Sequence, residues 1–354
     1  MGDIEKQKAD EELRRLPARE VISRVGLESS MSHKCVGALI FTYRCSIACP
    51  HCLFGCGPRK QSPPMSVDDG LLYLRQLHEL DRVIHIAGGE AMLYWDELAA
   101  LVQRAGREGI APHFIETNSS WAVRDSLVRE RFQHFRDCGV LGMYFSADPY
   151  HFMHVPPENY LRARAIACEI FGERHVCGHK AAPEKAEEFV RIGRDPELLA
   201  AYVRRSIPMM VGNAADRLAQ YLPDIAIERL DLTPGTRSSF ASGCFRAVVP
   251  PSVWELHIDP YGNIQTNCGI MLGHAKRTAP REVLARGVNG TNPIVAIIAE
   301  KGPAGLLELA YEKGCPDIPH AKSKCNLCYK ARTFLRPHFP DILGPDEAYT
   351  ASHA

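Results

Sequence analysis

The stretch that decides the fold is Cys45-Ser-Ile-Ala-Cys49-Pro-His-Cys52, which comes shortly after the apolar run Val36-Gly-Ala-Leu-Ile-Phe41. The apolar run predicts a buried strand. The uneven spacing of the cysteines favours a wrapped loop over a helix face, and such a loop can place three thiolates around one point. Three is one fewer than an iron–sulfur cluster or a structural zinc ion normally takes from protein. If the metal is an iron–sulfur cluster, one iron is therefore left open to a small molecule.

This arrangement, Cx3CxxC after a first strand, resembles the signature of the radical S-adenosylmethionine (SAM) superfamily. The resemblance implies that Cys45, Cys49 and Cys52 hold a [4Fe-4S] cluster whose fourth iron is chelated by the amino and carboxylate groups of SAM. It also implies reductive cleavage of SAM to methionine and a 5′-deoxyadenosyl radical, which abstracts hydrogen from a substrate. A structural zinc site is the alternative, although such sites usually pair CxxC units and close with a fourth ligand.

Composition limits the class of protein. The 354 residues could form two domains, and the hydrophobic content of 45% is enough for an ordinary core. Lys and Arg together number 42, as do Asp and Glu, so no overall basic field predicts a nucleic-acid partner. No apolar run approaches the roughly 20 residues that cross a bilayer, and residues 1–15 are charged rather than signal-like. We therefore expect a cytoplasmic protein without a membrane segment.

The 13 cysteines fall into groups that favour metal ligation. A reducing compartment argues against a disulfide framework. The scattered cysteines are expected to be small buried hydrophobic residues, and Cys56 is expected to be a bystander of the front group. The front group is Cys45, Cys49, Cys52 and Cys56, the back group is Cys244, Cys268, Cys315, Cys325 and Cys328, and the scattered ones are Cys35, Cys138, Cys168 and Cys177.

The pattern after Cys35 alternates apolar runs with helical stretches, which predicts βα units and a parallel sheet. Six repeats in about 200 residues favour a partial (β/α)6 TIM-like barrel over an eight-fold barrel, which usually needs about 250 residues. Predicted strands cover 36–42, 83–87, 112–117, 141–146, 174–179 and 225–232, with 208–211 as the alternative fifth strand. The first predicted helix after the cysteine loop begins at the capping sequence Ser66-Val-Asp-Asp69. Further helices are predicted over 95–105, 123–135, 158–171 and 183–204.

We expect three parts in this α/β chain. Residues 1–32 are predicted to form an N-terminal helical cap, and residues 33–238 the partial barrel. Residues 239–354 are predicted to form a small C-terminal α+β iron–sulfur cluster domain, because the alternation stops and the cysteines return there among glycines and prolines.

Polar residues follow the second and third predicted strands, where a parallel barrel carries its functional groups. Gly88-Gly89-Glu90 offers two residues that let a ligand approach the backbone and a carboxylate that can accept from an ammonium group. The resemblance implies that this segment binds the SAM amino group. Thr117-Asn118-Ser119 is similar to the T-N-G turn of the family, with Ser119 in place of the glycine. We therefore expect Thr117 and Asn118 to contact the cofactor.

The fourth strand ends in Ser146-Ala-Asp148-Pro-Tyr-His151, and Arg162 follows. This segment resembles the S-x-D-x-x-x-H segment of several SPASM-type enzymes, although His151 comes one residue early. The resemblance implies that Ser146, Asp148 and Arg162 reach the ribose and carboxylate of SAM. A polar loop with a helix cap is the alternative. His51 occupies the position in which the family places an aromatic residue near the adenine.

In the back third, His257-Ile-Asp-Pro-Tyr-Gly262-Asn-Ile-Gln-Thr-Asn-Cys268 predicts a β-hairpin that delivers a thiol. Cys325-Asn-Leu-Cys328 adds a CxxC at the start of a predicted terminal helix. Together these resemble the auxiliary-cluster domains called SPASM and twitch, which implies one auxiliary [4Fe-4S] cluster on Cys244, Cys268, Cys325 and Cys328. Cys315 is then a spare, a substitute ligand or a hydrogen-atom donor in catalysis. A zinc ribbon is the alternative.

Three classes of function remain open from the sequence. The first is a radical SAM oxidoreductase or maturase, supplied by a flavodoxin- or ferredoxin-type electron donor. Its hypothesised substrate is a peptide or protein side chain that is oxidised or cross-linked, and the alternative is a dehydrogenase or epimerase of a small polyol, aminosugar or nucleotide. The second class is a non-catalytic zinc-binding module. The third is an electron-transfer protein whose clusters are both closed.

Overall fold

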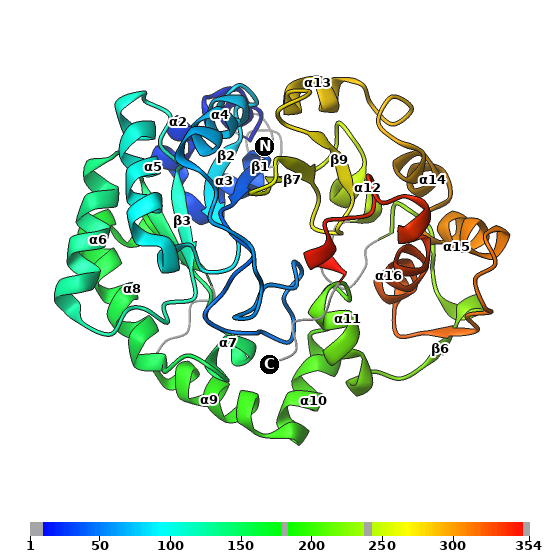
Figure 1. Ribbon diagram of the computed structural model, residues 1–354. Coiled ribbons are helices and arrows are strands. Elements are labelled where there is room, and N and C mark those ends of the chain that lie inside the picture. Colours follow the sequence, from blue (N-terminus) through cyan, green and yellow to red (C-terminus); the bar gives the residue numbers. More distant parts are fainter. Residues whose placement is uncertain (1–9, 179–182, 237–242, 350–354) are drawn as a thin grey trace, which may run out of the picture.

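An eight-stranded sheet runs through the computed structural model, which describes residues 10–178, 183–236 and 243–349. Its strand order is β5-β4-β3-β2-β1-β7-β8-β9 (Figure 1). The first five strands are parallel neighbours, which confirms the first five predicted strands within a few residues. Residues 208–211 are not a strand, so the alternative fifth strand is wrong. The five are β1 (Val36–Ile40), β2 (Val83–Ala87), β3 (Phe114–Thr117), β4 (Gly142–Phe145) and β5 (Val176–Gly178).

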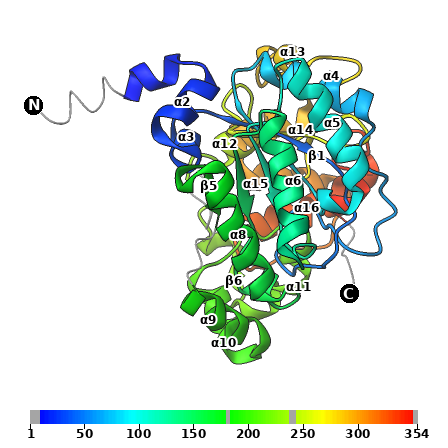
Figure 2. The same ribbon diagram turned by 90° about the vertical axis from the view of Figure 1, so that its left-hand side faces the viewer.

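Four helices lie side by side over one face of these strands (Figure 2): α4 (Val67–His78), α5 (Trp95–Arg107), α6 (Asp125–Asp137) and α8 (Pro157–Phe171). The hydroxyl of Ser66 accepts from the backbone N–H of Asp69 over 3.1 Å, so the predicted cap of α4 is confirmed. The charged stretch forms two helices, α9 (Pro183–Arg194) and α10 (Pro196–Arg205), because Asp195 caps α10.

The predicted N-terminal cap is helical in its described part, which starts at residue 10. Residues 10–15 are helical, and α2 (Ala18–Val25) and α3 (Leu27–His33) follow. Apolar side chains of α2 and α3 pack against Val83 and Phe114, the first residues of β2 and β3. Because successive strand residues point to opposite faces, this contact lies opposite Ile84, which belongs to the core under the outer helices. The two helices thus cover the start of the parallel strands.

The sixth predicted strand, 225–232, is wrong as a barrel strand. Only β6 (Ile225–Ala226) forms there, and it pairs antiparallel with β10 (His320–Ala321) in a separate two-stranded sheet. The cause is packing: Leu230 and Leu232 lie against Leu307 and Leu327 of the C-terminal helices instead of entering the sheet. The described residues therefore form an open sheet whose first five strands are parallel, and they show no closed barrel.

The predicted hairpin is confirmed by β7 (Glu255–Ile258) and β8 (Asn263–Gln265), which are antiparallel. β7 pairs in parallel with β1, so the hairpin and β9 (Met271–His274) extend the central sheet. The domain boundary between residues 238 and 239 lies outside the described residues and stays a prediction. The sheet itself continues from one predicted domain into the other.

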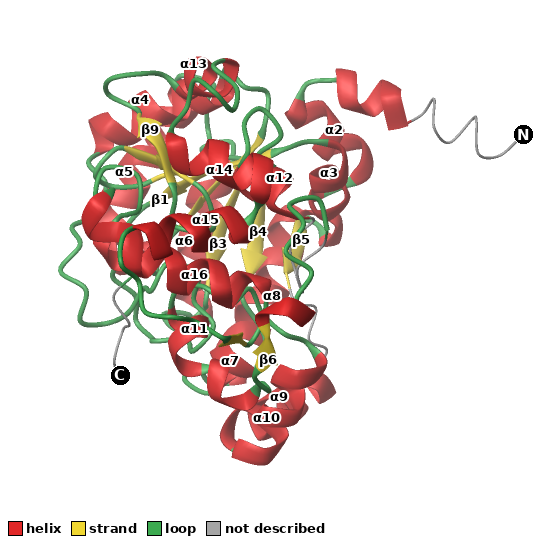
Figure 3. Ribbon diagram, turned by 90° about the vertical axis from the view of Figure 1, so that its right-hand side faces the viewer, coloured by secondary structure: helices red, strands yellow, loops and turns green. Residues whose placement is uncertain are grey.

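Helices α12, α14, α15 and α16 lie on the side that Figure 3 turns to the viewer. The remaining α-helices are α7 (Pro149–Phe152), α11 (Asn213–Arg217), α12 (Gly243–Val248), α13 (Pro280–Ala285), α14 (Pro293–Lys301), α15 (Pro303–Glu312) and α16 (Lys324–Leu335). The 3-10 helices are η1 (Ala91–Tyr94), η2 (Glu173–His175), η3 (Ala219–Tyr221), η4 (Ile227–Arg229), η5 (Arg336–His338) and η6 (Asp346–Ala348). Among the helices in the described ranges, none has the length and apolar character that a bilayer crossing requires.

Candidate metal and cofactor site

The cysteine loop connects β1 to α4 and is buried. Cys45 and Cys49 are each 7% exposed, and Cys52 is half-buried. The side-chain amide of Asn118, at the end of β3, donates to the sulfur of Cys45 over 3.4 Å. The loop therefore lies at the carboxyl ends of the parallel strands, where the sequence predicted a site.

Helix α11 holds the loop from a distant part of the chain. The side-chain amide of Asn213 donates to the carbonyl of Cys49 over 3.0 Å, and the guanidinium of Arg217 donates to the carbonyl of Ala48 over 2.8 Å. Asn213 is fully buried. These hydrogen bonds fix the loop backbone between two cysteines, so they limit where the thiols can lie.

The thiols of the loop influence one another. Burial and the neighbouring Cys49 raise the pKa of Cys45 well above its ordinary value, and burial also raises the pKa of Cys49. A hydrogen bond from the thiol of Cys56 lowers the pKa of Cys52 to about 7. Cys56, expected to be a bystander, thus contacts a predicted ligand. Three thiolates in one buried loop require positive charge beside them, which metal ions supply.

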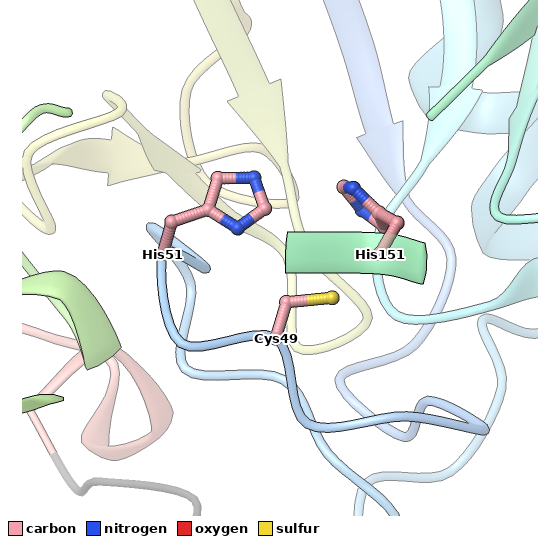
Figure 4. A group of neighbouring side chains, drawn as sticks. All are labelled: Cys49, His51 and His151. Atoms are coloured by element: carbon pink, nitrogen blue, oxygen red, sulfur yellow. The ribbon is translucent and has the colours of Figure 1, made fainter. Parts of the chain in front are cut away.

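The three thiols of the loop do not converge on one point as the ligands of a single zinc ion do. The sulfurs of Cys45, Cys49 and Cys52 do not all lie within 4.8 Å of one another. The ligand atoms of Cys49, His51 and His151 do (Figure 4). Around one zinc ion with Zn–S distances of about 2.3 Å, thiolate sulfurs stand only about 3.8 Å apart. A [4Fe-4S] cube instead gives each thiolate its own iron, so the sulfurs stand farther apart.

Gly88 and Gly89 are packed against the start of the cysteine loop. A Cβ on Gly89 would lie 1.8 Å from the carbonyl oxygen of Arg44, and one on Gly88, which has φ +117°, would lie 2.7 Å from that of Thr42. The N–H of Gly89 donates to the Thr42 carbonyl over 2.6 Å. The sequence suggested that these glycines admit a ligand. The close approach that the structure shows is that of the loop backbone.

Glu90 joins the ends of β2 and β3 to the cysteine loop. Its carboxylate is 1% exposed and accepts from the hydroxyl of Thr117 over 3.0 Å and from the N–H of Asn118 over 2.8 Å. Burial raises the pKa of Glu90 to about 7, against the effect of these hydrogen bonds. A cation beside Glu90 would favour its ionised form. Three predicted cofactor-binding residues are thus in contact, and one of them touches Cys45.

Asp148 links two histidines beside Cys49. It caps α7, accepting from the N–H of His151 over 3.0 Å and from its Nδ1 over 2.9 Å. Nε2 of His51 lies 3.4 Å from the other carboxylate oxygen of Asp148. Figure 4 shows both imidazoles beside the sulfur of Cys49. Asp148 is therefore a helix cap and also part of a polar group at the cysteine loop.

Ser146 and Arg162 lie differently with respect to this group. The hydroxyl of Ser146 donates to the carboxylate of Glu116 over 3.2 Å, at the ends of neighbouring strands. Arg162 donates to Asp125 over 3.0 Å and to the carbonyl of Ala122 over 2.8 Å. These partners hold Arg162 at the start of α6, and none of them belongs to the cysteine loop or to the Asp148 group. The predicted contact of Arg162 with the cofactor therefore stays a prediction without structural support.

The four cysteines predicted as auxiliary ligands line one pocket. Its volume is about 440 Å³, including the part that opens to solvent. Cys244 lies on α12, Cys268 follows β8, and Cys325 and Cys328 lie on the first turns of α16. Cys315 is not among the lining residues; it follows α15, where its N–H donates to the carbonyl of Ala310.

A buried guanidinium lines the same pocket. Arg332 is fully buried, and its Nε donates to the sulfur of Cys328 over 3.4 Å. One terminal nitrogen donates to Tyr349 and to the carbonyl of Cys268, and the other, also buried, has no hydrogen-bond partner. No carboxylate in the described ranges lies within ion-pair distance of it. Because a buried charge without a counter-charge is costly, this pocket fits an anionic group such as a thiolate-bound cluster.

Comparison with known proteins agrees with the front site. Residues 39–154 match the model of the radical SAM superfamily. The matched radical SAM domain begins in β1 and ends just after α7, so it contains the cysteine loop, the Gly88-Gly89-Glu90 segment and Asp148. The match supports SAM-dependent radical chemistry in an enzyme that uses a [4Fe-4S] cluster, and enzymes of this superfamily need an electron donor.

One similar solved structure is the crystal structure of BtrN in complex with AdoMet and 2-DOIA. It is 13% identical to this chain, with a TM-score of 0.37, and the alignment covers 74% of this chain and 84% of that one. Comparison with curated proteins found no match.

Several residues around the cysteine loop were missed from the sequence. Asn213 and Arg217 carried no signal, because their link to the loop is a contact between segments far apart in the chain. For Arg332 the sequence held a weak signal, since Arg332 follows Cys328 by four residues and therefore lies on the same side of the predicted helix.

Ser119 provides a test of the turn after β3. It has φ +65°, is fully buried, and its hydroxyl has no hydrogen-bond partner. We predict that Ser119→Gly raises the free energy of unfolding by about 1 kcal/mol, because glycine adopts a left-handed backbone without strain. Ser119→Ala is the control, since it removes the hydroxyl but keeps the strain. Denaturant unfolding of the metal-free chain measures both, and equal stability of the two variants would contradict the prediction.

Proposed function

We propose that this protein is a radical SAM oxidoreductase or maturase with a second, auxiliary [4Fe-4S] cluster of the SPASM or twitch kind. The observation that carries the proposal is the contact of Cys45, in the loop that holds the three cysteines, with Asn118, which shares the buried carboxylate of Glu90 with Thr117. Cys45, Cys49 and Cys52 would hold the first cluster. When bound, that cluster supplies the electron that splits SAM to methionine and a 5′-deoxyadenosyl radical, which abstracts hydrogen from the substrate.

The chain's own residues would bind and orient SAM. Gly88 and Gly89 fix the loop, and the Glu90 carboxylate lies where the SAM amino group is expected from the family resemblance. Asn118 would keep its contact with Cys45. On the other side of the loop, Asp148 and His51 form a polar group suited to a ribose or a purine. Ser146 and Arg162 are the weaker candidates for the SAM carboxylate.

Cys244, Cys268, Cys325 and Cys328 would hold the auxiliary cluster, with Arg332 as its buried counter-charge. A cluster with four protein ligands has no open iron, so its work would be electron transfer to or from the substrate radical. That role favours a net oxidation or a cross-link. Cys315 does not line this pocket, which leaves its proposed role as hydrogen-atom donor without support from a contact.

The proposed substrate is a peptide or protein side chain, and a small polyol, aminosugar or nucleotide is the alternative. We also propose a flavodoxin- or ferredoxin-type electron donor and a cytoplasmic location. Product analysis after incubation with candidate peptides and metabolites distinguishes the two substrate classes.

SAM cleavage tests the proposal directly. We predict that the anaerobically reconstituted and reduced protein produces 5′-deoxyadenosine and methionine, and that Cys49→Ser lowers this to background while about four iron ions per chain remain in the auxiliary site. Cys138→Ser, at the end of α6 and far from both sites in the chain, is the control and should behave as the parent. Zinc in place of iron, or no SAM cleavage by the parent, would instead favour the zinc module or the closed electron-transfer protein.

Arg332 gives a test of the auxiliary site alone. In the Cys49→Ser background, Arg332→Met is predicted to make the reduction potential of the remaining cluster more negative, because a nearby cation stabilises the reduced, more anionic state. Arg336→Met is the matched control: Arg336 lies one turn further along and contacts Tyr349 and Asp346, but not the cysteines. Redox titration measures both variants. An Arg332→Met potential equal to that of the Arg336→Met control would contradict the prediction.

A further inference from the structure

Two histidines and a glutamate meet on the face of the sheet opposite the outer helices. In the strand register, Ala38 of β1 pairs with His85 of β2 on one side and with His257 of β7 on the other. The two imidazoles therefore stand level, separated by a residue with a small side chain. Glu255 lies two residues before His257 and so points to the same face.

The rings are held from both sides. Phe114 stacks on His85 with ring centroids 4.5 Å apart, and Phe54, just after the cysteine loop, contacts His257 edge-on at 4.9 Å. His85 and His257 are 4% and 2% exposed. The side chain of Glu255 is 18% exposed, so a small molecule can reach this buried group past it.

The carboxylate of Glu255 makes one long hydrogen bond with His85 and lies just beyond hydrogen-bond distance from His257, and both distances also suit a shared ion. The ligand atoms of the three side chains lie within 4.8 Å of one another. One carboxylate oxygen of Glu255 is 3.3 Å from Nε2 of His85 and 3.6 Å from Nε2 of His257. Charge-assisted hydrogen bonds are shorter, at about 2.7–2.9 Å. Around a tetrahedral ion with metal–ligand distances of about 2.0–2.2 Å, neighbouring ligand atoms stand about 3.4 Å apart, which agrees with both distances.

The side chain of Glu255 is oriented by a hydrogen bond, as the ligands of metal sites are. The amide of Asn267 donates to the other carboxylate oxygen of Glu255 over 2.7 Å, which leaves the first oxygen free to face the histidines. Nδ1 of each histidine is buried without a hydrogen-bond partner. The carboxylate of Glu116 lies 3.8 Å from Nδ1 of His85. With Nε2 on a metal, Nδ1 of His85 would carry the proton and face Glu116, which at this distance accepts no hydrogen bond from it; metal-binding histidines usually donate this proton to such a group.

We propose that His85, Glu255 and His257 bind one divalent transition-metal ion, Zn²⁺ or Fe²⁺, as a metal centre separate from both cysteine groups. Two imidazoles and one carboxylate are a donor set that these ions take in proteins, with further coordination positions left open. Those positions would take water or an oxygen donor of a small molecule that enters past Glu255. The inference uses no cysteine and does not rest on the proposed function.

The metal content of the loaded protein tests this. Holoenzyme with its cysteine sites filled anaerobically is equilibrated with a small excess of Zn²⁺, desalted, and analysed for zinc and iron together. The wild type is expected to hold one more metal ion per chain than His257→Gln. His134→Gln, a half-buried histidine of α6, is the matched control and should equal the wild type. Glu255→Gln is a second variant, to be used if His257→Gln does not fold.

Diffraction locates the ion. Data collected on both sides of the zinc absorption edge should give an anomalous peak between His85, Glu255 and His257 in the wild type and none in His257→Gln. Equal metal content in wild type and folded His257→Gln, or a zinc peak elsewhere in the molecule with none at this position, would overturn the proposal.

Discussion

The end of β2 is packed so tightly against the start of the cysteine loop that no side chain fits between them. Gly89 meets the carbonyl of Arg44, and the backbone hydrogen bonds of Gly89 and Glu90 to Thr42 and Arg44 hold the two segments together. Because of this contact, the loop cannot move without moving β2. It also brings Glu90 under the loop, where the ends of β2 and β3 share its carboxylate. The arrangement of the front site follows from that one approach of two backbones.

Buried charge is the second constraint, and it acts at both cysteine groups. The thiols of the loop have little solvent around them, so burial keeps Cys45 and Cys49 protonated unless positive charge is present. In the pocket lined by the back cysteines the buried charge is positive. Arg332 is buried among thiols there, and no carboxylate in the described part of the chain lies within ion-pair distance of it. Each arrangement is costly alone and becomes favourable with a metal group whose charge complements it. Both cysteine groups therefore suit a bound metal group of complementary charge.

Much of the fold could be predicted because β1 to β5 are short apolar runs with clear boundaries. The failure at 225–232 has a simple reason: Leu230 and Leu232 are apolar, as strand residues would be, but a pattern cannot say which element covers them. The resemblance to SPASM and twitch domains implied Cys244, Cys268, Cys325 and Cys328 as one ligand set, and the four line one pocket, although ligation itself stays a prediction. The contact of Asn213 with the loop, and the placement of His85 and His257 on either side of Ala38, could not be predicted, because both depend on register and contacts set by the whole sheet.

The central claim is that the cysteine loop holds a four-iron cluster with one iron free of protein ligands. Mössbauer spectroscopy of the ⁵⁷Fe-loaded Cys325→Ser protein, with and without SAM, measures this most directly, since that variant should retain the front cluster alone. The account predicts one iron site in four whose signal shifts to higher coordination when SAM is added, while the other three do not change. Four irons that are all unaffected by SAM would contradict it.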